Sequence, residues 1–232
     1  METSGTRRKV FYREAAYPVG IILLSFGTAL MTEADFGLSM VVAPAYLIHL
    51  KVSQTLAFYT FGMSEYIFQG VLLCFLAVLM RRFKLTYLLS FVTAFIYGQC
   101  LDVWMKVVSL FTFEGIAWRV FCYIAGLVLG SAGVAFIFHT YLTPEAYELF
   151  VKEFCARFHT PLDRTKIVYD CCSALLGIIL SFAFFGFGKF VGISWGTIIC
   201  AIVNGWLIGR ICDRLDAVFV FKDRFKHNSD LF

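Results

Sequence analysis

The sequence predicts an all-α integral membrane protein with six transmembrane helices, arranged as two inverted three-helix repeats. Three observations predict this fold class. The chain is 60% hydrophobic and only 16% charged, it contains six long apolar segments, and similar small and polar residues recur at an almost constant offset. A water-soluble domain carries about 25% charged residues, so an ordinary soluble core is excluded.

Each predicted span is an apolar stretch close to the roughly 20 residues that a helix needs to cross the hydrocarbon layer. The stretches fill most of the 232 residues, so no sizeable soluble domain fits beside them. They cover residues 17–34, 58–80, 85–106, 119–141, 168–188 and 193–211.

Two further segments are predicted not to cross the membrane. Residues 38–50 are apolar but short, and Pro44 interrupts them, which favours a re-entrant or interfacial piece. Residues 144–160 follow the helix-start sequence Thr143-Pro144-Glu145 and place aromatic side chains at helical spacing. This pattern predicts an amphipathic helix that lies on the membrane surface.

The distribution of lysine and arginine predicts the orientation. With the N-terminus inside, 16 of the 20 basic residues lie on the inner side and four on the outer side. The positive-inside rule therefore places both termini in the cytoplasm. The alternative is a cleaved signal peptide, because Arg7 to Arg13 precede the first apolar stretch. Cleavage would leave five spans with the same asymmetry of charge.

An internal repeat divides the chain into residues 1–116 and 117–232. Spans one to three match spans four to six at offsets of 106, 105 and 107. Each half has an odd number of crossings, so the second half enters the membrane in the opposite orientation. Chance recurrence of small residues in membrane helices is the alternative. The matches are Tyr17, Gly20 and Gly27 with Tyr123, Gly126 and Gly133; Thr60 and Glu65 with Thr165 and Asp170; and Ser90, Ala94 and Gly98 with Thr197, Ala201 and Gly205.

Polar residues inside the spans indicate where a site lies, because they are costly in hydrocarbon and face protein or a water-filled cavity. Asp102 precedes Lys106 by four residues, which predicts an ion pair, and His139 is predicted to make an interfacial hydrogen bond. Glu65 lies about two turns into its span and is the first candidate for a substrate or proton contact. The predicted substrate-binding set is Glu65, Gln69, Asp35, Thr28, Asp170 and Asn204.

Signatures of soluble-enzyme chemistry are absent from the sequence. There is no G-x-x-x-x-G-K-[ST] phosphate loop, no H-E-x-x-H and no G-x-S-x-G. The eight cysteines lie mostly in apolar runs and lack zinc-site spacing. We therefore predict that the protein is not an enzyme, holds no metal or cofactor, binds no nucleic acid and does not drive transport with ATP by itself.

Three stretches resemble the YczE/YitT-like multi-pass membrane proteins of bacteria. The motif Phe36-Gly37-Leu38-Ser39 only partly reproduces the second glycine-rich turn of that family. The resemblance implies six spans, a bacterial plasma membrane and transport, but no catalytic residues and no substrate. The stretches are GIILLSFGTALMTEADFGLS (20–39), DRTKIVYDCCSALLGIILSFAFFG (163–186) and GISWGTIICAIVNGWLIGRI (192–211).

The sequence thus predicts a small secondary transporter or permease that works by alternating access between the two halves. The alternative is a non-transporting accessory or regulatory protein. It would bind a cytoplasmic partner through the basic tail Lys222 to Phe232 and the helix in residues 144–160. The protein is expected to contact the lipid bilayer. Whether it also forms a homodimer or binds a partner subunit is left open by the sequence. The substrate and the coupling ion are not predicted.

Overall fold

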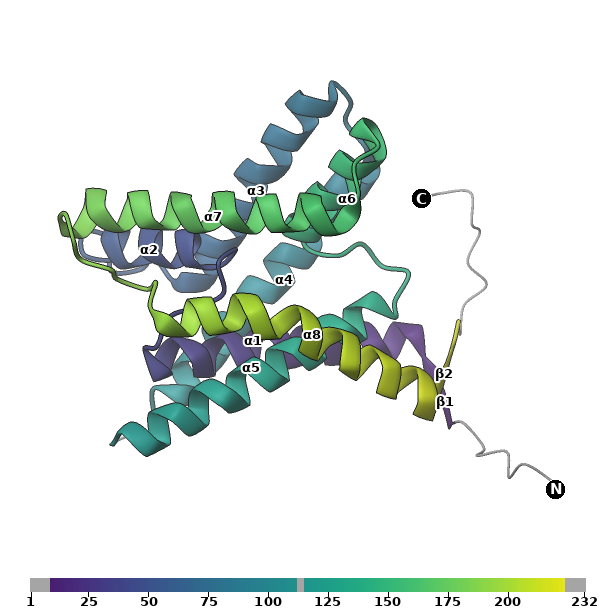
Figure 1. The fold of residues 1–232 in the computed structure, drawn as a ribbon, viewed down its shortest axis with the longest axis horizontal. Coiled ribbons are helices and arrows are strands. Elements are labelled where there is room, and N and C mark those ends of the chain that lie inside the picture. The colour runs from purple at the N-terminus through teal and green to yellow at the C-terminus, as the bar shows by residue number, and fades with distance from the viewer. Residues whose placement is uncertain (1–8, 112–114, 224–232) are drawn as a thin grey trace.

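A computed structural model describes residues 9–111 and 115–223, which form eight α-helices and one two-stranded sheet (Figure 1). Six helices are long and apolar enough to cross a membrane, which confirms the six predicted spans. The two short helices are α2 (Ala43–Val52) and α6 (Ala146–Phe158). The long helices are α1 (Arg13–Ala34), α3 (Phe61–Met80), α4 (Leu85–Val108), α5 (Ile116–Phe138), α7 (Leu162–Phe185) and α8 (Trp195–Val218).

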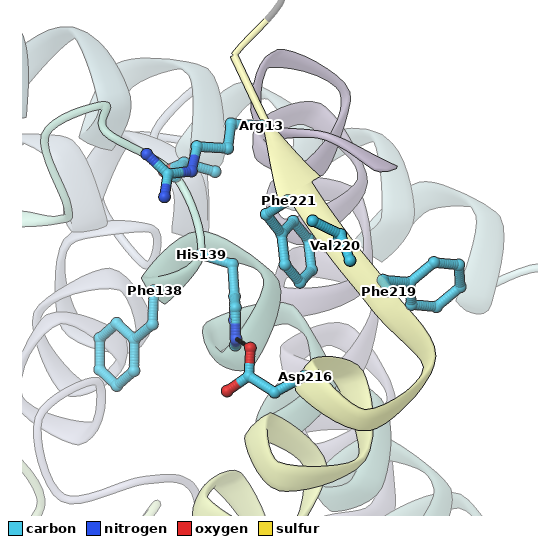
Figure 2. Close-up of a pocket in the computed structure, with 8 residues that line it drawn as sticks. Arg13, Phe138, His139, Asp216, Phe219, Val220 and Phe221 are labelled. Carbon is cyan, nitrogen blue, oxygen red and sulfur yellow. Dashed lines mark hydrogen bonds and ion pairs between the residues drawn. The ribbon is translucent and has the colours of Figure 1, made fainter. Parts of the chain in front are cut away.

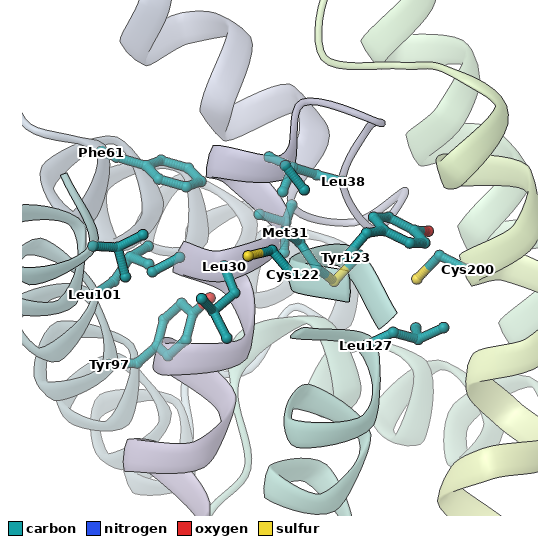
Figure 3. Packing of buried hydrophobic residues seen from close by; sticks show 14 of the residues in the cluster. Leu30, Met31, Leu38, Phe61, Tyr97, Leu101, Cys122, Tyr123, Leu127 and Cys200 are labelled. Carbon is teal, nitrogen blue, oxygen red and sulfur yellow. The ribbon is translucent and has the colours of Figure 1, made fainter. Parts of the chain in front are cut away.

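Helix α1 forms the centre of the bundle and packs against α5 on one side and α4 on the other. Figure 3 shows Leu30 and Met31 of α1 between residues of α4 and residues of α5. Glycines allow α1 and α5 to approach closely, because a Cβ atom at Gly27 would lie 2.5 Å from the backbone nitrogen of Gly130. Spacing in the sequence puts Ser25, Thr28, Thr32 and Asp35 on one face of this helix, which should point into the bundle. The first three are buried, whereas the Asp35 side chain is 79% exposed.

Helix α3 begins at a pair of capping contacts. The Thr60 hydroxyl accepts the backbone N–H of Met63 and donates to Asp102 of α4 at 2.6 Å. Asp102 also accepts the backbone N–H of Gly62 at 2.7 Å. The predicted ion pair of Asp102 with Lys106 is therefore wrong. The free N–H groups at the start of a neighbouring helix bind the carboxylate instead.

Helix α6 is only partly the predicted surface helix. Its first two turns are buried against α3, α4 and α7, and Ala146, Tyr147 and Leu149 are each at most 3% exposed. Its second half reaches the surface, where Glu153 pairs with Lys84 at 2.7 Å. The prediction of a surface helix is wrong for the first two turns of α6, because their apolar side chains pack on α3 and α4 rather than on lipid.

The sheet joins the two ends of the described chain and was not predicted. Strand β1 (Lys9–Tyr12) pairs in parallel with β2 (Phe219–Lys222). The first and last described segments of the chain therefore lie side by side (Figure 1). This is expected if the chain crosses the membrane an even number of times between them. Most of the basic tail lies outside the described residues.

Candidate functional site

The interior of the described bundle holds a polar cluster where the start of α6 meets the middle of α3. Glu65 and Gln69 lie one turn apart on α3, and neither is exposed to solvent. The Gln69 amide nitrogen donates to a carboxyl oxygen of Glu65 at 3.3 Å and to one of Glu145 at 3.4 Å. Its amide oxygen accepts the backbone N–H of Ala146 at 3.1 Å. One glutamine therefore joins two buried carboxyl groups to the start of α6.

The two carboxyl groups are incompletely hydrogen-bonded. The Tyr147 hydroxyl donates to Oε2 of Glu65 at 2.9 Å. By contrast, Oε1 of Glu65 and Oε1 of Glu145 are buried and have no hydrogen-bond partner. Burial, and after it the negative charge of Glu65, raises the pKa of Glu145 above its ordinary value. An unpaired buried carboxylate is costly, so this arrangement favours a proton or another positive group at the pair.

A lysine on α7 faces the same region. Lys166 Nζ lies 2.9 Å from Glu148 of α6 and 3.7 Å from Asp170 of α7. Its charge is therefore shared by two carboxylates other than the buried pair. The cluster, as far as the structure describes it, combines four carboxyl groups with one lysine.

Hydroxyl groups of α4 hold the loop between α5 and α6 inside the bundle. Ser90 donates to the carbonyl oxygen of Pro144 at 2.8 Å, and Thr93 donates to that of Thr143 at 3.0 Å. The Thr93 hydroxyl also lies 2.8 Å from the Tyr17 hydroxyl of α1. Backbone carbonyls that lack helical partners are thus satisfied by side chains, as irregular backbone inside a membrane requires. These contacts position Glu145, the residue that follows the loop.

Four of the six predicted substrate-binding residues lie in or near this cluster. Glu65 and Gln69 contact one another directly. Thr28 on α1 accepts a hydrogen bond from the Tyr97 hydroxyl of α4 at 3.0 Å. Asp170 is linked to α6 through Lys166 rather than through Glu65.

The other two predicted residues lie elsewhere in the bundle. Asp35, at the end of α1, pairs with Arg119 of α5 at 3.2 Å, and its side chain is 79% exposed. Asn204 on α8 accepts a hydrogen bond from Ser131 of α5 at 2.8 Å. Both side chains have partners on α5, which separates them from the α3–α6 contact. The structure therefore does not bring all six residues into one site.

Sequence reasoning missed Glu145 and Tyr147 as members of the cluster. Both lie in the segment 144–160, which was interpreted as a surface helix. A usable signal was present, because a short helical segment follows the first span of each half, at residues 38–50 and 144–160. Two such segments in corresponding positions are the sequence pattern that points to a binding site in inverted-repeat transporters.

A hollow lies near the paired chain ends (Figure 2). It has a volume of about 440 Å³, and Arg13, His139, Asp216 and Phe221 are among its lining residues. His139 Nε2 lies 3.1 Å from Asp216, and Nδ1 lies 2.6 Å from the carbonyl oxygen of Ala135. These contacts confirm the predicted hydrogen bonding of His139. They engage both ring nitrogens of His139.

The polar cluster does not have the composition of a multivalent metal site. Within residues 9–111 and 115–223, no three side chains of His, Cys, Asp or Glu gather closely enough to hold a metal ion. The part of the cluster around Glu65 and Glu145 offers two carboxyl groups, the Gln69 amide and the Tyr147 phenol, which suit a proton, a monovalent cation or a small polar molecule that donates hydrogen bonds.

Comparisons with known proteins give a family but no activity. The chain is 28% identical over 212 residues to "Uncharacterized protein YyaS" of Bacillus subtilis (strain 168), which covers 90% of this chain and 96% of that relative. No solved structure matches. The finer resemblance to YczE/YitT-like proteins is carried by neither match and stays a prediction. Residues 11–213 match the family of unknown function DUF6198, and the chain belongs to that family.

Proposed function

We propose that this membrane protein is a small secondary transporter that moves its substrate by alternating access, with its site at the α3–α6 polar cluster. One observation carries the proposal: a half-length helix starts inside the bundle beside two buried carboxyl groups. Transporters built from inverted repeats bind their substrates near the middle of the bilayer, next to discontinuous helices. A purely structural core has no need of two unpaired buried carboxyl oxygens.

The depth of the site follows from its contacts. Gln69 lies at the middle of α3, and the first N–H of α6 binds its side chain. Further along α6, Glu153 binds Lys84, which lies in the turn between α3 and α4. Helix α6 therefore runs from mid-depth to one membrane surface. Its N-terminus, the positive end of the helix dipole, points into the site.

The arrangement of helices supports the inverted repeat. Each half has one long helix, one short helix and then two long helices. The contacts between α1 and α5 also come in pairs: adding 106 to a residue of α1, and subtracting it from a residue of α5, turns one contact into another. A Cβ atom at Gly20 would lie 2.9 Å from the carbonyl oxygen of Gly133, and one at Gly126 would lie 2.7 Å from that of Gly27. A two-fold axis between the halves predicts such a reciprocal pair of contacts.

A second reciprocal contact joins the last span of each half to the loop before the short helix of the other half. Ser90 on α4 donates to the carbonyl oxygen of Pro144 at 2.8 Å. The offset of 107 relates Ser90 to Thr197 and relates Pro144 to Gly37. A Cβ atom at Gly37 would lie 2.5 Å from the Thr197 hydroxyl. A loop thus approaches the corresponding position of the last span in both halves, through a hydrogen bond in one half and close packing in the other.

The last two spans pack differently in the two halves. In the first half, Gly62 of α3 packs directly on the backbone of Gly98 of α4. The offsets relate these residues to Ile167 of α7 and Gly205 of α8, yet a Cβ atom at Gly205 would meet nothing within 4 Å. This difference lies within each half and makes the two halves unequal in their internal packing.

The proposed location is the bacterial plasma membrane, with both termini in the cytoplasm. The excess of lysine and arginine on one side supports this orientation. The pairing of β1 with β2 supports an even number of crossings between them.

The alternative, an accessory protein that binds a cytoplasmic partner, loses part of its support. It relied on an exposed helix in residues 144–160, but the first half of α6 is already buried against α3 and α4. The other proposed docking element, the basic tail, lies largely outside the described residues.

The proposal is tested by a ligand screen on the purified full-length protein. A ligand that binds only the folded state raises the melting temperature by mass action. We expect a metabolite that stabilises the wild type and fails to stabilise Glu65→Gln, because that carboxyl group lies inside the site. The same compound is then assayed for uptake into vesicles that contain the protein.

Asp35→Asn is the matched control, because it removes an exposed carboxylate at the end of α1. We expect this variant to keep both the thermal shift and the uptake. A compound that stabilises all three proteins equally would place its binding outside the cluster. Binding without uptake would contradict transport and favour the accessory role.

A further inference from the structure

The buried carboxyl pair of Glu65 and Glu145 has an unusual balance of contacts. Both carboxyl groups contact the same amide nitrogen of Gln69, within 3.4 Å. Glu65 is fully buried and Glu145 is only 9% exposed. Each group nevertheless keeps one oxygen, Oε1, with no hydrogen-bond partner. Two such groups cannot both be ionised in a low-dielectric interior without a large cost in free energy.

The surroundings supply one positive charge, that of Lys166, and two other carboxylates already share it. From α2, Tyr46 and His49 lie against Phe61 at the start of α3 rather than at the pair. Lys166 of α7 is already bound to Glu148 and Asp170. The titratable side chains that face the pair from the packed helices are Tyr17 of α1, Tyr97 of α4, Tyr147 and Glu148 of α6, and Lys166 and Tyr169 of α7.

A metal ion fits the pair poorly, because most oxygen atoms around it are engaged. The amide oxygen of Gln69 accepts the N–H of Ala146. Oε2 of each carboxyl group accepts from the Gln69 amide, and that of Glu65 also accepts from Tyr147. Only the two Oε1 atoms stay free among these groups. A hard cation takes about six or more oxygen ligands, whereas a proton needs one oxygen to bind.

We propose that Glu65 and Glu145 form a proton-binding site, in which the pair carries one proton at neutral pH. Binding converts one carboxylate and one proton into a neutral carboxylic acid, and release reverses this step without any change in oxidation state. The pair titrates as a unit, so the proton belongs to both residues rather than to either one.

Proton binding by the pair does not depend on the proposed transport function, but the role that we give to this proton does. In a transporter, protonation removes a charge at the start of α6 and lowers the cost of moving this cluster through a closed state. Release on the other side restores the charge. The substrate would then move together with, or in exchange for, one proton per cycle.

Infrared spectroscopy of the full-length protein in lipid tests the site directly. A protonated carboxyl group has a carbonyl stretching band that an ionised one lacks. We expect the wild type to show this band at neutral pH and to lose it at alkaline pH. Glu145→Gln and Glu65→Gln should each lose the band at a lower pH than the wild type, because the remaining carboxyl group is still buried but no longer has its like-charged neighbour.

The matched control is Glu153→Gln, which removes a carboxylate of the same helix at its exposed ion pair with Lys84. This variant should keep the band. A wild type without the band at neutral pH would overturn the proposal, and that result needs no variant. A band that disappears at the same pH in the wild type and in both single variants, or one that sodium or potassium abolishes at constant pH, would overturn it as well.

Failure of the proton site is distinguishable from failure of the transport proposal. The infrared band reports protonation whether or not the protein transports anything. A band with the expected variant pattern, in a protein that moves no substrate into vesicles, would leave the site standing and refute transport. Substrate uptake that is independent of pH, in a protein without the band, would refute the proton site alone.

Discussion

Substitution of Gly126 by alanine tests the close crossing of α1 and α5. A Cβ atom at this position would lie 2.7 Å from the carbonyl oxygen of Gly27 and 3.0 Å from the backbone nitrogen of Met31. The helices must separate by roughly 0.7 Å to bring the shorter distance to the 3.4 Å of ordinary contact. Both obstacles are backbone atoms, which cannot rotate away. Overpacking of a well-packed interior costs about 1–3 kcal/mol.

Gly130→Ala is the matched control, one turn further along α5. A Cβ atom there would meet nothing within 4 Å, and alanine forms helix better than glycine. We expect the thermal midpoint of the purified protein, followed by tryptophan fluorescence in one detergent, to fall by several degrees for Gly126→Ala. The midpoint for Gly130→Ala should stay level or rise. Equal losses in both variants, or no loss at Gly126, would refute the described crossing.

The remaining predictions concern a cap, a loop contact and the pH dependence of stability. Asp102→Ala should lower the free energy of unfolding by about 1–2 kcal/mol because the start of α3 loses its acceptor, whereas Lys106→Ala should change it little. Equal losses for the two variants in denaturant titrations would instead support an ion pair between Asp102 and Lys106. Ser90→Ala should cost about 1–3 kcal/mol because the buried carbonyl oxygen of Pro144 loses its donor, and faster hydrogen exchange around that loop would report the loss; unchanged exchange would contradict the contact. The pKa of Glu145 is raised in the folded state, so the folded protein binds this proton more tightly than the unfolded chain. Its contribution to stability should be complete below the ordinary carboxyl pKa and should fall as the pH rises through the folded-state value. Unfolding measured over this pH range should show a shallower decline in Glu145→Gln, and an identical decline would count against a protonated carboxyl.

Much of the fold could be predicted from the sequence, because hydrocarbon imposes a simple rule on length and polarity. The long apolar segments became the six long helices. Of the polar face on α1, Ser25, Thr28 and Thr32 are buried, but Asp35 at the helix end is exposed. The sequence did not predict the sheet of β1 and β2. Strands of four residues at opposite ends of a chain leave no periodic pattern, and their pairing depends on where the helices bring them.

The site was predictable only where it lies on one helix. Glu65 and Gln69 are one turn apart on α3, so helical spacing alone places them on one face. Glu145 lies 80 positions beyond Glu65 in the chain. The short segment that contains it could be recognised from the sequence, but the proximity of Glu145 to Glu65 could not. Its position depends on α4 hydroxyls that hold the preceding loop, at Ser90 and Thr93. Such contacts between distant segments cannot be derived from spacing.

Asp102 shows why a local pattern can mislead. Its distance of four residues from Lys106 suits a pair on one helix face. The structure uses the carboxylate to bind N–H groups of another helix instead. Those groups would otherwise stay unsatisfied inside the bundle, and satisfying them outweighs a weak surface ion pair.

The pairing of β1 with β2 sets an order of events during biosynthesis. The first strand leaves the ribosome before any span is made, and its partner emerges only after the sixth helix. Throughout insertion, β1 therefore carries an open strand edge, which is a template for pairing with other chains. The late arrival of Phe219–Lys222 seals that edge and ties the first helix to the last. A chain truncated before Phe219 would keep all six long helices but leave the edge of β1 unpaired and open to other chains.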